Sequence, residues 1–110
     1  MKLVKCIVRE NKVEETTDAL RRIDLPCVTV THVGGHGRQN NPKGSWRGTD
    51  YEIRYLPQMM IDVVVPDDEV DDVVRIVLET ARTGERGDGR VFVMPVEEAY
   101  TIRTRASGPE

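Results

Sequence analysis

Cysteine is scarce in this chain, and its scarcity excludes two classes of small protein. Only two of the 110 residues are cysteines, Cys6 and Cys27. A disulfide framework needs more of them, and a zinc site needs cysteines or histidines at short, regular spacing. We therefore expect two free thiols and a cytoplasmic protein, because the cytoplasm keeps thiols reduced.

Excess positive charge and long apolar runs are also lacking. The chain has 16 Lys and Arg against 19 Asp and Glu, for a net charge of −3, whereas nucleic-acid-binding domains present a basic face. No segment approaches the ~18 apolar residues of a membrane span. The N-terminal stretch MKLVKCIVRE lacks the apolar core and cleavage site of a signal peptide. We predict no nucleic-acid partner and no membrane span.

Short runs of β-branched residues recur along the chain. They predict strands at 3–9, 27–33, 59–65 and 91–96, with 101–104 as a candidate fifth strand. A first helix is predicted at about 12–23, where Asn11 and Glu14 have capping-box spacing and Pro26 prevents continuation.

A second helix follows Pro66 and ends at Gly84. Its apolar residues recur at helical spacing and predict the buried stripe: Val70, Val73, Val74, Val77, Leu78 and Ala81.

The element order is strand-helix-strand, a long connection, then strand-helix-strand again. Right-handed crossovers place both helices on one face of an antiparallel sheet. The predicted fold class is α+β, a ferredoxin-like βαββαβ sandwich in a single domain covering residues 1–110. No predicted element covers the other sheet face, so we expect the chain to be a subunit of an oligomer.

Two polar segments are candidates for function. The segment 82–90 combines three glycines with three arginines, a composition suited to phosphate oxygens; an ordinary turn is the alternative interpretation. The long connection begins with Gly34-Gly35-His36-Gly37-Arg38-Gln39 and carries Trp46 and Tyr51 near its tip. Connections of this length without secondary structure are usually functional or disordered, and the aromatic residues favour a protein partner.

No nucleophile–base pair is evident, because His32 and His36 have no obvious orienting acid. We therefore predict a binding protein and not an enzyme. An acylphosphatase-like enzyme on the same fold is the alternative; it would use Arg9 and Asn11, but the glycine-rich loop such enzymes place before the first helix is missing. RNA binding through strand aromatics has only Phe92 to offer.

Three stretches together resemble the PII signal-transduction family of nitrogen regulators: RGTDY at 47–51, VVPDDEVDDVV at 64–74, and TARTGERGDGRVFVMPVEEAYTIRT at 80–104. The resemblance runs from residue 1 to about 105. It implies that residues 36–55 are the T-loop, an arm that inserts into target proteins, and that residues 105–110 form a C-terminal tail.

The resemblance also implies a homotrimer with nucleotide sites in the clefts between subunits. ATP and ADP compete there, AMP is a further candidate, and Mg2+ accompanies ATP. The implied phosphate-binding residues are Gly37, Arg38, Gly87, Asp88, Gly89 and Arg90, with Arg103 from the neighbouring subunit. Thr29, Asp62 and Val64 lie where the family holds adenosine. Gln39 matches a Mg2+ ligand, Tyr51 a modified tyrosine, and Trp46, Arg47 and Tyr51 the part of the T-loop that contacts a target.

The sequence departs from the family at several positions, two of which bear most directly on ligand binding. Gln58 follows Leu56-Pro57, where the family has a lysine that grips 2-oxoglutarate, and Thr101 replaces the first of two arginines. Replacing an ammonium by an amide removes a charge-assisted hydrogen bond. We therefore predict weak or absent 2-oxoglutarate binding. The expected function is regulation of a target protein of nitrogen or related metabolism, a transporter or an enzyme, by the nucleotide-dependent conformation of the T-loop.

Overall fold

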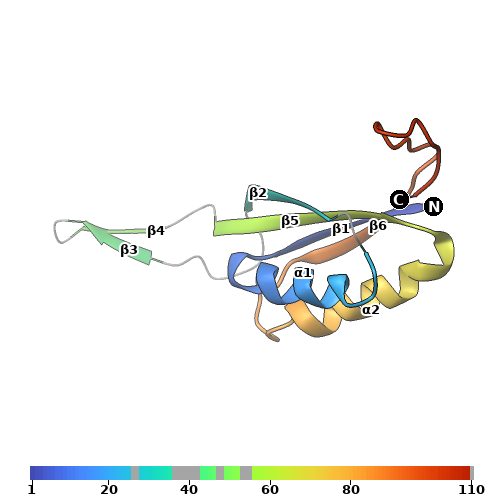
Figure 1. The fold of residues 1–110 in the computed structure, drawn as a ribbon. Coiled ribbons are helices and arrows are strands. Elements are labelled where there is room, and N and C mark those ends of the chain that lie inside the picture. The colour runs from blue at the N-terminus through green and yellow to red at the C-terminus, as the bar shows by residue number, and fades with distance from the viewer. Residues whose placement is uncertain (26–27, 36–42, 47–48, 53–55, 110) are drawn as a thin grey trace.

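The computed structural model describes residues 1–25, 28–35, 43–46, 49–52 and 56–109, with side chains described outside 35–56 (Figure 1). Four strands form one antiparallel sheet in the order β2-β5-β1-β6. Their bounds are Lys2–Arg9 for β1, Thr29–Gly35 for β2, Leu56–Val65 for β5 and Arg90–Pro95 for β6. β1 and β5 are central, so β2 and β6 are the two opposite edges of this sheet.

Two helices, α1 (Val13–Arg21) and α2 (Val70–Ala81), lie side by side on one face of the sheet (Figure 1). The alternation of strand side chains explains why. In β1, Val4, Cys6 and Val8 are buried beneath the helices, whereas the residues between them face the other side. The core consists of these residues together with Leu20, Leu25, Met59, Ile61, Val63, Val65, Val73, Val77 and Ala81. The predicted ferredoxin-like βαββαβ arrangement is confirmed.

The open face of the sheet, opposite the helices, is covered by none of the described helices (Figure 1). The strand register and the alternation of side chains place Lys5, Met60, Asp62, Phe92 and Met94 on this face. Phe92 is 42% exposed and Met94 36%. The apolar part of this face is therefore exposed to solvent in the single chain.

The predicted start of the first helix and the predicted ends of both helices differ from the structure. Asn11 lies inside a 3-10 turn, Glu10–Lys12, and the N-cap position of α1 is Lys12, which makes no side-chain cap hydrogen bond. The predicted capping box is therefore wrong, because Asn11 is already within a helical turn and not in the extended conformation of a capping residue. α1 ends at Arg21 and α2 at Ala81, where Arg82 turns extended, so Gly84 is not the helix stop.

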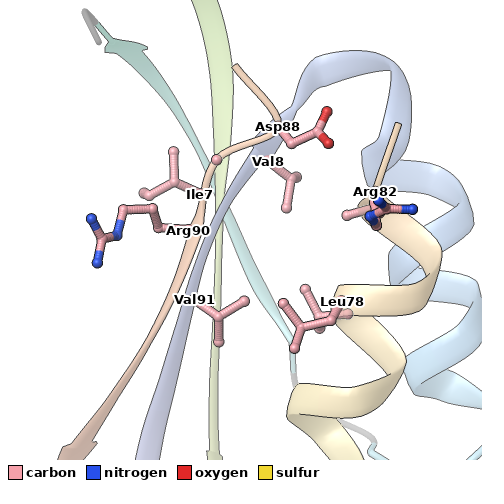
Figure 2. Close-up of a pocket in the computed structure, with 10 residues that line it drawn as sticks. Ile7, Val8, Leu78, Arg82, Asp88, Arg90 and Val91 are labelled. Carbon is pink, nitrogen blue, oxygen red and sulfur yellow. The ribbon is translucent and has the colours of Figure 1, made fainter. Parts of the chain in front are cut away.

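The apolar stripe of α2 is confirmed except at one residue. Val73, Val77 and Ala81 are buried, and Val70 and Val74 pack against the core. Leu78, predicted to be buried, is 55% exposed. It lies at the edge where β6 ends the sheet, so no further strand covers it (Figure 2).

The predicted fifth strand is absent. Residues 102–104 form a turn, and the flanking Tyr100 and Ser107 make an isolated antiparallel bridge. The Thr101 N–H donates to the Ala106 carbonyl at 2.8 Å, and the Arg105 N–H donates to the Thr101 carbonyl at 2.8 Å. Residues 99–108, which include the start of the predicted 105–110 tail and are called the tail from here on, therefore pair with one another instead of extending the sheet.

The long connection contains two strands that were not predicted from the sequence. Strands β3 (Lys43–Trp46) and β4 (Thr49–Glu52) form a separate two-stranded sheet, with Trp46 opposite Thr49. The missed signal is the two-residue connection ending in glycine, a common hairpin pattern. In addition, β2 and β5 extend to Gly35 and Leu56, which pair with each other, so both strands reach further into this segment than predicted.

None of the helices in the described part of the chain is long and apolar enough to cross a membrane.

Candidate functional site

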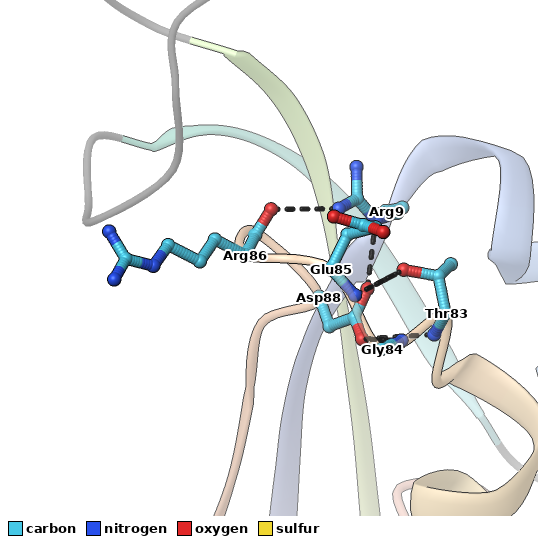
Figure 3. Close-up of polar contacts among 6 residues, drawn as sticks. All are labelled: Arg9, Thr83, Gly84, Glu85, Arg86 and Asp88. Atoms are coloured by element: carbon cyan, nitrogen blue, oxygen red, sulfur yellow. Dashed lines mark hydrogen bonds and ion pairs between the residues drawn. The ribbon is translucent and has the colours of Figure 1, made fainter.

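The carboxylate of Asp88 is the main hydrogen-bond acceptor in the loop that connects α2 to β6. Its carboxylate accepts hydrogen bonds from the Thr83 N–H at 2.9 Å, the Gly84 N–H at 2.9 Å and the Arg9 Nε at 3.0 Å (Figure 3). The Thr83 hydroxyl donates a further bond to Oδ1. Desolvation acts to raise the pKa of Asp88, but the donors of Thr83, Arg9 and Gly84 outweigh it and hold that pKa well below its usual range. The carboxylate is therefore ionised and fully engaged within the protein.

Arg9 ties the end of β1 to this loop through two bonds. Besides its Nε bond to Asp88, its Nη2 donates to the Arg86 carbonyl at 2.9 Å (Figure 3). An acylphosphatase-like mechanism would need the Arg9 guanidinium free to hold a phosphate beside Asn11. Both bonds commit it to the loop, so the geometry disfavours that alternative.

Gly89 must be glycine, because the loop here passes directly over β1. Its φ is +101°, and a Cβ at this position would lie 1.7 Å from the carbonyl oxygen of Ile7. Gly87 also has a left-handed backbone, with φ of +100°. No hydrogen bond found among the described residues uses the N–H of Gly87 or of Gly89. These two donors can therefore receive an anion.

A cavity of about 410 Å³ lies beside the loop, between α2, β1 and β6. Figure 2 shows Val8, Leu78 and Val91 pointing into it, with Asp88 and Arg82 nearer the loop. Arg90 points to the other side of β6, where its guanidinium lies 5.5 Å from the centre of the Phe92 ring. Arg90 is thus presented on the open sheet face and not among the apolar residues under α2.

A second cavity, of about 390 Å³, lies where β2 and β5 meet the tail. It brings together three residues predicted to hold adenosine, Thr29, Asp62 and Val64, with Thr101 and Ile102 of the tail. Asp62 forms an ion pair with Lys5 at 3.5 Å. The ion-paired oxygen, Oδ1, is buried and accepts no hydrogen bond from the described residues, so Lys5 is its charged neighbour.

Within one chain, the predicted nucleotide residues fall into two groups. The loop group, Gly87, Asp88, Gly89 and Arg90, lies at the β6 edge. The tail-side group lies beyond β1, with Thr29 in the edge strand β2, Asp62 and Val64 in the central strand β5, and Arg103 in the turn beside the second cavity. β6 is two strand spacings, about 10 Å, from β5 and three, about 14 Å, from β2. A single chain therefore does not bring its two groups together.

Several predicted residues cannot be placed. Gly37, Arg38, Gln39 and Arg47 lie outside the described residues. Trp46 is in β3 and Tyr51 in β4, where only the backbone is described. Among the described residues, no cluster of three His, Cys, Asp or Glu side chains is arranged to hold a metal ion.

Two hydrogen-bond partners of Asp88 were not predicted. Thr83 could have been found from its position, because a hydroxyl beside an aspartate in a glycine-rich turn commonly bonds locally. Arg9 has no such signal, since it is 79 residues away from Asp88 in the sequence. Only the pairing of β1 with β6 brings them together.

The fold and this loop define a small ferredoxin-like domain with an anion-receptive turn at one sheet edge. Comparison with known proteins identifies one family. A family model described as "Nitrogen regulatory protein P-II" matches residues 1–106. "Nitrogen regulatory protein P-II 2" of Methanothermobacter thermautotrophicus is 44% identical over 108 residues, covering 98% of this chain and 94% of that protein.

Two further relatives come from different organisms. "Nitrogen fixation nifHD region GlnB-like protein 1" of Methanobacterium ivanovii is 44% identical, covering 98% of this chain and 99% of that protein. "Nitrogen regulatory protein GlnK" of Escherichia coli is 41% identical over 104 residues, covering 94% of this chain and 93% of that protein. The chain belongs to the P-II family of nitrogen regulatory proteins. It is accordingly a signal-transduction regulator and not an enzyme.

Proposed function

We propose that this regulator binds adenine nucleotides, ATP or ADP with AMP as a further candidate, at sites shared between the subunits of a homotrimer. The observation that carries the proposal is the separation, within one sheet, of the loop group beside β6 from the tail-side group on β2 and β5. The loop group offers the phosphate donors, whereas the residues predicted to hold adenosine belong to the tail-side group. A second copy of the chain supplies the missing half.

Cyclic assembly joins the two groups without new elements. In a closed ring, the loop group of each subunit meets the tail-side group of the next, so each interface repeats the same pair of different surfaces. A trimer then contains three equivalent sites. Assembly also covers the open face of the sheet, where Phe92 and Met94 are exposed in the single chain.

The chemistry of each half fits a nucleotide. The free N–H groups of Gly87 and Gly89 and the guanidinium of Arg90 suit phosphate oxygens, and Arg103 of the neighbouring subunit adds a second cation. The partly exposed carboxylate of Asp62 lines the second cavity and suits a donor on the adenosine part. Gln39 as a Mg2+ ligand remains a prediction, because it lies outside the described residues.

Regulation follows if the nucleotide changes which T-loop conformation is stable. The T-loop joins β2 to β5, and the target protein would bind one of its conformations through Trp46, Arg47 and Tyr51. A ligand can shift this equilibrium only by binding the conformations with different affinities. Modification of Tyr51 would act on the same surface.

Substitution of Arg90 tests the proposal directly. Arg90→Ala should weaken ADP and ATP binding by about 1.5–3 kcal/mol, the range for a hydrogen bond to a charged group. Isothermal titration calorimetry with ATP, ADP and AMP, each with and without Mg2+, measures this. Arg75→Ala is the matched control, because Arg75 is an exposed arginine of α2 paired with Asp72 and Glu79. Equal affinities for both variants would remove Arg90 from the site.

A further inference from the structure

We propose that Asp88 is a positioning residue, which shapes the phosphate-binding loop through Thr83 and Arg9 while its own carboxylate makes no contact with the nucleotide. This inference rests on the proposed nucleotide site. It changes the role that the family resemblance assigned to Asp88, and it adds Thr83 and Arg9 to the residues on which phosphate binding depends.

The first argument is charge. A free carboxylate between Gly87 and Gly89 would repel a phosphate group. Figure 3 shows the Asp88 carboxylate directed at Thr83, Gly84 and Arg9. Its partner Arg9 carries the opposite charge at 3.0 Å, so the pair is neutral overall. The sequence Gly-Asp-Gly-Arg therefore presents the positive charge of Arg90 to a ligand without an opposing charge from its own aspartate.

The second argument is closure of the loop. Asp88 bonds to the backbone of Thr83 and Gly84, five and four residues before it, and so fastens the end of the loop to its beginning. The Thr83 hydroxyl adds a bond to the same carboxylate. Because the two left-handed glycines flank Asp88 directly, fixing its position also fixes the directions of their N–H groups.

The third argument concerns Arg9 and the peptide between Arg86 and Gly87. Arg9 Nη2 holds the Arg86 carbonyl at 2.9 Å. In a trans peptide, the carbonyl and the N–H of the next residue point in opposite directions. Holding this carbonyl towards Arg9 therefore turns the Gly87 N–H away from it, where it can meet an anion. The same bond removes a carbonyl oxygen that would otherwise oppose a phosphate.

The experiment compares two substitutions of Thr83, an exposed residue whose change leaves the core intact. Thr83→Val keeps the shape of the side chain but removes its hydroxyl, whereas Thr83→Ser keeps the hydroxyl. The dissociation constant of each variant is measured for ADP and for adenosine, which lacks phosphate. We expect Thr83→Val to bind ADP about tenfold more weakly, as for loss of one hydrogen bond, with adenosine binding unchanged. Thr83→Ser should match the wild type for both.

The possible outcomes separate the inference from the proposed function. If the wild type does not bind ADP, the proposed function fails. If the wild type binds ADP and Thr83→Val binds it equally well, only the positioning role fails. A parallel loss of ADP and adenosine binding would indicate general damage to the fold and would also overturn the positioning role. Asp88→Asn provides a second variant: if its amide oxygen keeps the two backbone donors, its NH2 group faces the Arg9 Nε donor, so the bond to Arg9 is lost and the selective loss of ADP binding should be reproduced.

Discussion

Gly89 leaves no room for a side chain where the loop crosses β1. A Cβ would lie 1.7 Å from the Ile7 carbonyl oxygen, and φ is +101°. We expect Gly89→Ala to lower the free energy of unfolding by more than about 1–3 kcal/mol, the cost of a strained backbone alone, because β1 or the loop must also move. Urea denaturation at a fixed protomer concentration measures the loss.

Gly84→Ala is the matched control within the same loop. Its φ is +91°, but the nearest atom to an added Cβ is the Arg82 Nη2 at 4.0 Å. This variant should show only the backbone cost, about 1–2 kcal/mol. Equal losses for the two variants would mean that the contact with Ile7 does not constrain the loop.

Cys6 makes the free energy of unfolding depend on pH in the alkaline range. It is fully buried, and desolvation, with a smaller contribution from the charge of Asp62, raises its pKa from 9.0 to about 12. The unfolded chain therefore releases this proton near pH 9 while the folded chain retains it. The contribution of the protonated Cys6 thiol to the free energy of unfolding is fully present below pH 9 and is lost as the pH rises towards 12.

Comparison with Cys6→Ala isolates this effect from other groups that titrate at high pH. Above pH 9, the unfolding free energy of the wild type should fall by about 1.4 kcal/mol per pH unit more steeply than that of the variant. Chemical denaturation at a series of pH values gives both slopes. Parallel curves would show that Cys6 does not hold its proton more tightly in the folded state.

The pairing of β1 with β5 brings Arg9 next to Gln58, which stands where the family resemblance implies a lysine. Arg9 is therefore a candidate to replace that lysine. Gln58 lies directly opposite Arg9 in the register, near the start of β5 and next to the proposed T-loop. Arg9 is nonetheless committed to Asp88 and to the Arg86 carbonyl. We therefore expect the wild type to bind 2-oxoglutarate weakly or not at all in the presence of Mg-ATP.

Gln58→Lys should improve that binding roughly ten- to a hundredfold, the gain expected from one charge-assisted hydrogen bond. Gln58→Met, of similar length but without charge, is the control and should bring no gain. Calorimetric titration of 2-oxoglutarate into each protein with saturating Mg-ATP compares them. Tight binding by the wild type would show that another cation compensates.

At the scale of elements, hydrophobic periodicity was sufficient to predict the strands of the main sheet and both helices. It reports which face is buried, and burial under α1 and α2 produced the alternation in β1. It could not predict that Leu78 lies beyond the sheet edge, because the stripe of α2 does not reveal where β6 ends. The candidate fifth strand failed because its backbone groups pair within the tail, which strand propensity does not describe.

The candidate site was predictable only in part. Glycines and arginines mark the loop 82–90 in the sequence, and the family signature names its members. The direction of a side chain is a different matter: the Asp88 carboxylate is turned inward by Thr83 and by Arg9. That arrangement depends on contacts between strands distant in sequence, which composition and spacing cannot show.

At the scale of the whole molecule, the central claim is that each nucleotide site combines the loop group of one subunit with the tail-side group of the next. Two variants each disable one half: Arg90→Ala at the β6 edge and Arg103→Ala in the tail. Each alone should bind ADP weakly while remaining a trimer, with a mass by light scattering of three times 12.5 kDa.

Mixing the two variants is the most direct test. They are unfolded together in equal amounts, refolded, and titrated with ADP. A site is intact when its loop group comes from the Arg103→Ala chain and its tail-side group from the Arg90→Ala chain, so random assembly should restore wild-type affinity at about one quarter of the sites. Recovery of that fraction supports shared sites. If no site regains wild-type affinity although mixed trimers have formed, the nucleotide site lies within a single chain and the account is wrong.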